Sequence, residues 1–435
     1  MNAVFKSIAT VCLVLLTSFF FFPINVTFLP SVNSKMALAA IGLVLLGLKL
    51  AKRSEARINQ DFLIVVLFAC GVSVASYFSI VLNGTPDTTY VSYVVSMLVW
   101  TMAAYTALSA INLVHSRIDV ELICYYLAAV CVFQCIIAIL IDTSAPVKAF
   151  IDSFYVDSSY MNEKKRLYGL GAALDIAGGR FGAVLIMISF MIIKAFKDNY
   201  AWNKKAFLLL SYGIIVVIGN MIGRTTTMGM MISIGVFLLF FFLDDSSGKS
   251  AALKWILTSV LAFVVFATYK YNTDQVWKDY LEFGFEGFFS LARVGKWEVH
   301  SNDMLMEGFI YPDNLRCWLI GDGYFEEASV IDQNYVGETW YGFYKGTDAG
   351  YSRFLFYFGL VGLSAFSLYF IKACHVCMKN FSQYKFMFVC ILLMNFVIWV
   401  KASTDLYPAF APFIALLSFM SDDSLEVLSQ ETDES

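Results

Sequence analysis

Residues 120–141 read VELICYYLAAVCVFQCIIAILI, an apolar run with one charged residue, Glu121, near its start. A helix needs about 20 predominantly apolar residues to cross a hydrocarbon core of roughly 30 Å. Within that core the backbone N–H and C=O groups must be satisfied inside the segment, and a helix achieves this. The run is therefore predicted to form a transmembrane helix.

Similar apolar runs recur along the chain of 435 residues. The predicted spans are 7–28, 36–51, 61–82, 90–112, 120–141, 176–194, 205–222, 225–243, 252–269, 350–371, 384–401 and 404–420. The pair that flanks Arg224 has a second interpretation, as one helix broken at that point. Hydrophobic residues make up 59% of the chain and charged residues 15%, an apolar share above that of soluble domains. We expect an all-α polytopic integral membrane protein with about 12 transmembrane helices.

Lysine and arginine predict how the spans are oriented, because positively charged loops stay on the cytoplasmic side. With both termini inside, the cytoplasmic segments hold fifteen of these residues, whereas the outer segments other than the longest loop hold seven. Both termini are therefore predicted to be cytoplasmic.

The order of spans and loops divides the chain into four parts. Residues 1–269 carry nine predicted helices, 270–349 form one large outer loop, 350–420 carry three more helices, and 421–435 form an acidic cytoplasmic tail. The loop is rich in Tyr, Trp, Phe, Gly, Asp and Glu, which indicates an ordered surface.

Composition excludes several classes of function. The net charge is −4 and there is no basic stretch interleaved with aromatic residues, so we expect no nucleic acid partner. Histidine occurs only as His115, His300 and His375, which are too scattered for metal-ligand spacing. We predict neither a metal nor a cofactor.

Arginines lie where the predicted spans meet the outer interface. A charge at the bilayer centre costs on the order of 3 kcal/mol or more, so Arg180 and Arg224 either extend to the headgroups or face a cavity. The stretch KKRLYGLGAALDIAGGRFG (164–182) adds Arg166 and five glycines. Arginine binds phosphate oxygens through two parallel hydrogen bonds, so a lipid diphosphate is an expected ligand. The glycines permit a close approach to a ligand or serve helix packing alone.

Two further clusters lie at the end of the large loop and within it. In GTDAGYSRFLFYFGLVGL (346–363), Asp348 and Tyr351 are i,i+3 neighbours if the segment is helical, and Arg353 follows. The alternative is a capping Asp, an interfacial Tyr and an interfacial Arg. In SLARVGKWE (290–298), Arg293 and Trp297 have the i,i+4 spacing of a cation–π pair or a sugar-stacking site. A solvated salt bridge of Arg293 is the alternative.

These features, in this order, resemble the Wzy polymerase and O-antigen ligase superfamily. The similar stretches are RLYGLGAALDIAGG (166–179), GRTTTMGMMISIGVFLL (223–239), LARVGKWE (291–298), LIGDGYF (319–325) and the segment after Thr347. The similarity covers about residues 160–370, and the first five spans match only in being hydrophobic. Ligases carry a His followed by Asn where this chain has Asp348 to Tyr351, and this difference favours a polymerase.

The resemblance implies metal-independent glycosyl transfer at the outer face of a bacterial inner membrane. Donor and acceptor would be polyprenyl-diphosphate-linked oligosaccharides, with membrane lipid, a chain-length regulator and a flippase as further partners. The alternatives are an O-antigen ligase, or a polysaccharide flippase or transporter; a flippase has no need of a folded outer loop.

The same resemblance, together with the chemistry of the step, assigns roles to nine residues. A glycosyl transfer of this kind needs a base for the attacking hydroxyl and positive charge to stabilise the departing diphosphate. Asp348 is the first choice as base, and Glu298 is the second. The residues expected to stabilise charge are Arg166, Arg180, Arg224, Arg293 and Arg353. Tyr351 and Trp297 are expected to contact the lipid-linked glycan.

Overall fold

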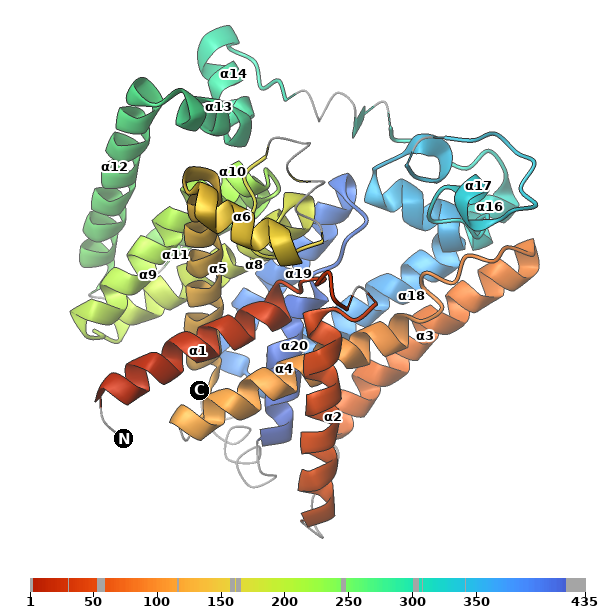
Figure 1. Cartoon of the computed structure of the whole chain (residues 1–435), viewed down its shortest axis with the longest axis horizontal. Helices are drawn as coiled ribbons and strands as arrows, with labels where there is room; N and C mark the ends of the chain where they lie inside the picture. The colour runs from red at the N-terminus through yellow and green to blue at the C-terminus, as the bar shows by residue number, and fades with distance from the viewer. Residues whose placement is uncertain are drawn as a thin grey trace. The chain divides into compact units, whose positions relative to one another are not determined.

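A computed structural model of the chain (Figure 1) describes residues 3–29, 31–52, 59–115, 117–156, 161, 166–243, 248–299, 305–306, 308–340 and 342–419. The predicted acidic tail, 421–435, lies outside the described residues, as does His300. The chain separates into two compact units. Unit 1 comprises Met1–Leu46 and Met102–Trp297, and unit 2 comprises Gly47–Thr101 and Glu298–Ser435.

The described part of the chain is all-α and contains ten helices that are long and apolar enough to cross a membrane. They are Ser34–Lys52 (α2), Gln60–Asn83 (α3), Tyr93–His115 (α4), Val120–Thr143 (α5), Leu174–Lys197 (α8), Trp202–Ile222, Thr226–Leu243 (α11), Lys249–Thr273 (α12), Gly350–Asn380 (α18) and Ser382–Lys401. The multi-pass prediction is confirmed at this level.

The first and last predicted spans are shorter than expected, so ten of the twelve meet the length of a membrane helix. Helix α1 (Ala3–Phe21) ends two residues before Pro23, because the residue before a proline is disfavoured in the helical conformation. The last predicted span is α20 (Tyr407–Leu416) with a 3₁₀ turn, Leu417–Phe419. It begins at Tyr407 because Pro408 has no N–H to donate to the carbonyl of residue 404, and proline is tolerated only in the first turn of a helix.

Unit 1 is built around α8, which is buried along nearly its whole length. A helix that is apolar on all sides is suited to such a position. Helices α11, α5 and α9 (Trp202–Ile214) pack against it. Gly229 of α11 lies so close to Gly182 of α8 that a Cβ atom would collide with the backbone. The unit also includes α6 (Ala145–Phe154), α13 (Gln275–Gly284) and α14 (Glu286–Val294).

The two spans that flank Arg224 form an antiparallel hairpin. Helix α9 continues through a π-helical turn, Ile215–Gly219, into α10 (Asn220–Ile222), and α11 begins at Thr226. Across the hairpin Tyr212 Oη lies 2.6 Å from Ser233 Oγ, and Thr227 Oγ1 donates to Asn220 Oδ1 at 2.6 Å. Residues equally far from the turn are thus neighbours, so the single broken helix is the wrong interpretation and the prediction of two helices is confirmed.

Unit 2 contains a broken helix elsewhere, within α18. Gly359 has φ +62° and ψ −167°, a conformation that divides α18 into a short first part and a longer second part. A Cβ atom at Gly359 would collide with the backbone of Leu319 and Ile320 in α16 (Leu315–Ile320). The break therefore allows α16 to approach closely, and only glycine fits there. The unit is completed by α3, α17 (Ala328–Ile331), two 3₁₀ turns (Tyr344–Gly346 and Ser382–Tyr384), α19 (Lys385–Lys401) and α20.

The carbonyl groups freed by this break have partners from other segments. The Phe356 carbonyl accepts a hydrogen bond from the backbone N–H of Asp322 at 2.6 Å, and the Tyr357 carbonyl accepts one from Ser79 Oγ at 2.6 Å. An unpaired backbone group in an apolar setting costs free energy, so such replacement bonds are what a broken membrane helix requires. The first bond fixes the segment after Gly321 against the first part of α18, and the second fixes α3 against it.

The long hydrophilic segment does not form one body. Helix α12 extends to Thr273, beyond the predicted end at 269, and is followed by α13 and α14 in unit 1 (Figure 1). From Glu298 onward the segment belongs to unit 2. There, Tyr324, Tyr344 and Phe356 pack around Cys317 in a small core of their own, so this part of the predicted loop is ordered.

Candidate functional site

Arg166 and Arg224 meet on one aromatic ring of unit 1. Arg224 lies in the turn between α10 and α11, and its guanidinium carbon is 4.4 Å from the centroid of the Phe283 ring. The corresponding distance for Arg166 is 4.9 Å. Phe283 lies near the end of α13, so the helix that follows α12 carries the ring that both cations contact. Arg166 and Arg224 are called the arginine pair below.

Glu286, the first residue of α14, is the ion-pair partner of Arg224. The pKa of the Arg224 guanidinium lies below its usual value, mainly because the group is buried. The positive charge of Arg166 lowers this pKa further, and the negative charges of Glu286 and Asp175 partly offset the shift. The Arg224 side chain is 18% exposed and that of Glu286 is 32% exposed, so both are reachable from solvent. The charge of Arg166 acts on Arg224, so an anion that displaced Glu286 would be attracted by both guanidinium groups.

Close packing around two glycines fixes the turn that carries Arg224. A Cβ atom at Gly223 would collide with the carbonyl oxygen of Leu174, and one at Gly178 would collide with Thr225 Oγ1. Thr225 Oγ1 donates to the Asp175 carbonyl at 3.1 Å. Gly178 thus serves helix packing, one of the two alternatives stated for the glycines of 164–182, and Gly223 packs in the same way. They hold the turn against the first turns of α8.

Arg180 is buried and serves the fold. It lies in the second turn of α8, and Nη1 donates to the carbonyl oxygen of Phe21 at 2.6 Å. Phe21 is the last residue of α1, so the guanidinium caps the carboxyl end of that helix, where a positive charge is favourable. Its guanidinium carbon also lies 5.7 Å from the centroid of Phe22. Arg180 therefore neither extends to the headgroups nor joins the arginine pair.

Arg293 and Trp297 do not form the predicted i,i+4 pair. Helix α14 ends at Val294, and Gly295 adopts a left-handed conformation that turns the chain. Arg293 forms a salt bridge with Glu282 at 2.6 Å, which was the alternative interpretation. The Trp297 ring folds back onto Phe288, with 4.9 Å between the centroids. The Trp297 side chain is 45% exposed, so part of the ring is accessible to a ligand.

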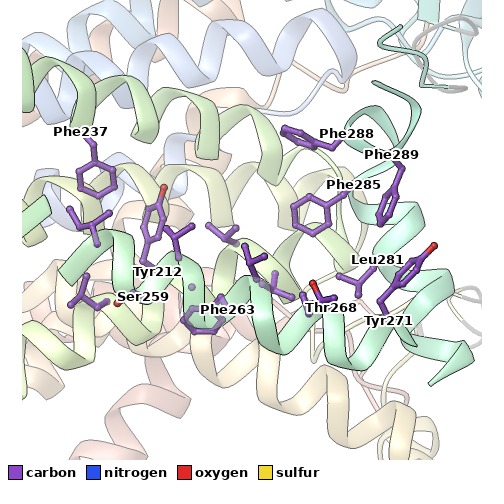
Figure 2. Close-up of a pocket in the computed structure, with 18 of the residues that line it drawn as sticks. Tyr212, Phe237, Ser259, Phe263, Thr268, Tyr271, Leu281, Phe285, Phe288 and Phe289 are labelled. Carbon is purple, nitrogen blue, oxygen red and sulfur yellow. The ribbon is translucent and has the colours of Figure 1, made fainter. Parts of the chain in front are cut away.

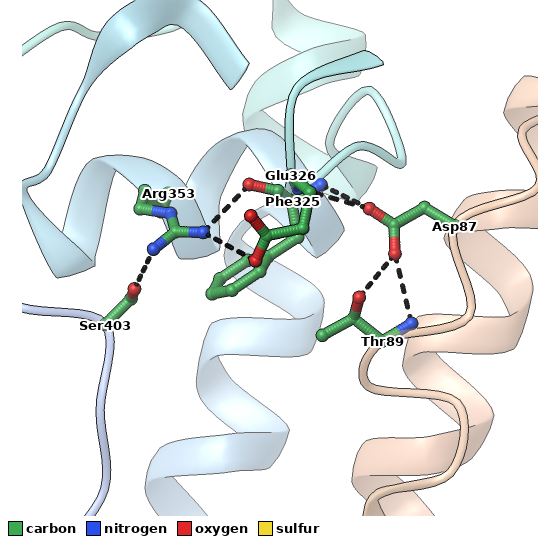
Figure 3. A network of polar contacts seen from close by, with 6 residues as sticks. All are labelled: Asp87, Thr89, Phe325, Glu326, Arg353 and Ser403. Atoms are coloured by element: carbon green, nitrogen blue, oxygen red, sulfur yellow. Dashed lines mark hydrogen bonds and ion pairs between the residues drawn. The ribbon is translucent and has the colours of Figure 1, made fainter. Parts of the chain in front are cut away.

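Arg353 is the centre of a polar network in unit 2 (Figure 3). Nη1 donates to Ser403 Oγ at 2.5 Å, and Nη2 donates to the Phe325 carbonyl at 3.0 Å and pairs with Glu326 at 3.2 Å. The rings of Phe325 and Phe343 lie 3.7 Å and 3.6 Å from the guanidinium carbon. Two rings at this distance cannot share one face, so both faces are covered. Arg353 joins three segments of unit 2 and is only 6% exposed.

Asp87 supports the same network from the other side (Figure 3). Oδ2 accepts hydrogen bonds from the backbone N–H groups of Phe325, at 2.7 Å, and Glu326, at 3.3 Å. Oδ1 accepts from the N–H and the hydroxyl of Thr89. The carboxylate thus orients the residues that contact Arg353. Sequence reasoning missed Asp87, Glu326 and Ser403, because their partners are distant in the chain.

The predicted carboxylates are both at the surface of unit 2. Asp348 and Glu298 are exposed. Helix α18 begins at Gly350 with Ala349 as its N-cap residue, so Asp348 precedes the helix and the predicted helical i,i+3 relation with Tyr351 is wrong. Tyr351 donates to the Phe396 carbonyl at 3.0 Å and packs against Trp399, so its hydroxyl is engaged within the fold.

No protein-family model, curated protein or solved structure matches this chain. The similarity to the polymerase superfamily consequently rests on the sequence motifs alone. Among the described residues there is no group of three or more His, Cys, Asp or Glu side chains arranged to hold a metal ion. The candidate site is therefore a cationic one: Arg166 and Arg224 both contact Phe283, and guanidinium groups are suited to binding phosphate oxygens.

Proposed function

We propose that this chain is a Wzy-type polymerase that joins polyprenyl-diphosphate-linked oligosaccharides at the outer face of a bacterial inner membrane. The product would be an O-antigen, capsule or exopolysaccharide. Two features support the proposal: the many helices long and apolar enough to span a membrane, and the described parts of the hydrophilic segment, which are α13 and α14 in unit 1 and the small core around Cys317 in unit 2. A lipid-linked substrate requires the first, and recognition of a glycan outside the membrane requires the second.

The meeting of Arg166 and Arg224 on Phe283 carries the proposal. A diphosphate has oxygens on two phosphorus atoms, and each guanidinium can donate two parallel hydrogen bonds. Phe283 holds both cations at a fixed surface, and Glu286 keeps Arg224 oriented before the substrate binds. Charge grows on the leaving oxygen in the transition state, so positioned cations lower the barrier.

The proposed step balances without an oxidant or a second donor. A hydroxyl oxygen of the acceptor glycan attacks the anomeric carbon of the donor, the bond between that carbon and the diphosphate oxygen breaks, and a base takes the hydroxyl proton. The products are a longer lipid-linked glycan and a free polyprenyl diphosphate. Asp348 remains our first proposal for the base and Glu298 the second, since a carboxylate near the bulk solvent can pass the proton on.

Arg353 has a different role in this proposal from the one expected for it. Its two terminal nitrogens are engaged with Ser403, Phe325 and Glu326, and both faces of the guanidinium are covered. We assign it to positioning the segment around Phe325. We assign Arg180 a structural role as well, because its guanidinium donates to the Phe21 carbonyl and caps the end of α1.

A deletion strain tests the proposed function. Loss of a polymerase should reduce the surface glycan from a ladder to a core carrying one repeat unit, because single units are still made, exported and attached. A ligase deletion would instead accumulate long polymer on the lipid carrier. A flippase deletion would trap single lipid-linked units inside. Either of these last two patterns, or a normal ladder in a strain without a second polymerase, would overturn the proposal.

A further inference from the structure

Two hollows of similar size in unit 1 differ in the chemistry of their walls. The one in Figure 2, between α12 and the α9–α11 hairpin, has a volume of about 530 Å³, and none of the described side chains that line it is charged. Such a wall does not distinguish one apolar ligand from another. The second hollow has a volume of about 520 Å³ and is lined by charged, hydroxyl and apolar side chains of α1, α4, α5, α9 and the turn between α4 and α5. It is called the polar pocket below.

One face of α5 forms a wall of the polar pocket. The lining residues on this helix have the 3–4 spacing of a single helical face: Glu121, Leu122, Tyr125, Tyr126 and Ala129. Tyr126 Oη lies 2.8 Å from His115 Nε2, and this contact ties the end of α4 to α5. The Tyr125 ring packs against Phe207, with 5.9 Å between the centroids, and this contact ties α9 to the same face. The pocket is therefore built from helices that contact one another.

Both carboxylates at the polar pocket already have partners within the fold. Glu121 accepts hydrogen bonds from Tyr200 Oη at 2.8 Å and 2.9 Å, and one of its oxygens lies 3.5 Å from Lys194 Nζ. Asp119 is the N-cap residue of α5, and its Oδ1 accepts a hydrogen bond from the Leu122 N–H at 2.8 Å. A negative charge at the start of a helix is also favourable. The two acidic groups are thus committed to the fold and do not call for a cationic ligand.

Two cations at the polar pocket have no carboxylate partner among the described residues. Arg117 is exposed in the turn between α4 and α5, and its guanidinium has no hydrogen bond, ion pair or ring contact with the described part of the chain. The Lys204 ammonium lies 5.1 Å from the centroid of the Tyr200 ring, a contact that leaves its charge unneutralised. A further donor, Tyr125 Oη, is buried and has no hydrogen-bond partner in the described chain. Because an unpaired buried hydroxyl costs free energy, the pocket favours a ligand that brings negative charge and hydrogen-bond acceptors.

We propose that the polar pocket binds an organic phosphate with an apolar portion. The phosphate oxygens accept hydrogen bonds from Arg117, whose planar fork suits them, and from Lys204. The apolar portion contacts Val14 and Phe207, which line the same pocket. Sites for small molecules combine an apolar lining with a few placed polar groups in this way. Two sources share this chemistry: a soluble organic phosphate, and the head group of an anionic phospholipid, which basic pockets between membrane helices also bind.

The polar pocket is separate from the arginine pair. Lys204 lies in the first turn of α9, and Arg224 follows Ile222 at the far end of the same helical segment. From Lys204 to Ile222 this segment is about 27 Å long at a rise of about 1.5 Å per residue. The ligand of the polar pocket is therefore distinct from the diphosphate proposed for the arginine pair, and the inference does not depend on the polymerase.

Photolabelling of the full-length protein in phosphatidylcholine nanodiscs tests this inference. The probes are soluble hexyl phosphate, a phosphatidylglycerol within the nanodisc, and hexanol as the neutral control, each with a diazirine on its alkyl chain; labelled peptides are identified by mass spectrometry. Arg117→Ala combined with Lys204→Ala removes both free cations, and Ala129→Trp fills the pocket while keeping them. Lys205→Ala is the matched control, because Lys205 is the next residue on α9, donates to Asn199 Oδ1 and does not line the pocket. Thermal unfolding in detergent identifies a variant that has not folded.

At least one phosphate probe should label α5 or α9 more strongly than hexanol does, and the double variant should reduce this labelling by about tenfold or more, because both charge-assisted contacts are lost. Ala129→Trp should also reduce it, whereas Lys205→Ala should leave it unchanged. Labelling by hexyl phosphate alone assigns the site to a soluble phosphate, and labelling by phosphatidylglycerol, alone or with hexyl phosphate, assigns it to a membrane lipid. The inference is overturned if neither phosphate probe labels α5 or α9, if hexanol labels them equally, or if either the folded double variant or folded Ala129→Trp labels like the wild type.

Discussion

Replacing Arg224 with lysine keeps a positive charge and removes the planar guanidinium. In the folded protein the change weakens a cation–π contact at 4.4 Å from Phe283, worth about 0.5–1 kcal/mol at exposed sites and ~2 kcal/mol when desolvated. It also weakens the ion pair with Glu286, whose side chain is 32% exposed, so that pair contributes no more than about 1 kcal/mol. Stability should therefore fall only slightly.

The effect on polymerisation should be larger, because lysine cannot donate two parallel hydrogen bonds to a phosphate. Loss of one charge-assisted hydrogen bond costs about 1.5–3 kcal/mol, which corresponds to a decrease in rate of roughly tenfold to over a hundredfold. Arg224→Ala should be at least as impaired. Arg316→Lys is the control, since Arg316 is an exposed arginine that donates to the Leu82 carbonyl and has no role in the proposal.

The assay is complementation of the deletion strain, with the glycan ladder read on a gel and protein amounts measured by immunoblot. Thermal unfolding in detergent separates a catalytic defect from a folding defect. A double variant, Arg166→Ala with Arg224→Ala, that is expressed normally and restores the full ladder would refute the reasoning, because neither arginine of the pair would then be present.

Three further predictions concern the fold of unit 2. Gly359→Ala should destabilise the protein by on the order of 1–3 kcal/mol from backbone strain alone, which would lower the unfolding temperature. Gly47→Ala is the control and should not lower it, because the added methyl group meets no other atom. Equal unfolding temperatures of the two variants would contradict the broken-helix geometry. Asp87→Ala leaves two backbone N–H groups without their acceptor and should cost about 1–3 kcal/mol, and an unchanged denaturation midpoint would count against the network. A hydrogen bond from Tyr324 lowers the pKa of the Asp332 carboxyl below its usual 3.8. The stability that this bond contributes is therefore present above pH 3.8 and is lost as the pH falls through the lowered pKa. Asp332→Asn should remove this part of the acid sensitivity, and identical acid unfolding curves of the variant and the wild type would contradict the prediction.

The sequence predicted the spans well because length and hydropathy decide them locally. It failed where a distant partner determines the conformation. Nothing next to Gly359 in the sequence reveals that α16 must approach there. The predicted end of α12 at 269 was early for a different reason: the polar residues after it continue the same helix to Thr273.

The candidate site was predictable in residue type but not in arrangement. Spacing identified Arg166 and Arg224 as interfacial cations, yet their common partner, Phe283, lies far from both in the sequence. Arg180 carried the same pattern and proved to cap α1. A charge that serves the fold and a charge that is available to a ligand have the same sequence signature, because burial and partners are set by tertiary packing.

Polymer formation by the purified protein tests the central proposal most directly. Protein in liposomes is supplied with a single lipid-linked repeat unit, and the products are separated by length. The proposal predicts lipid-linked glycans of two or more units, released polyprenyl diphosphate in matching amount, and loss of both when Arg166 and Arg224 are alanine. Unchanged single units with wild-type protein, under conditions in which it remains folded, would contradict the assignment of this chain as a polymerase.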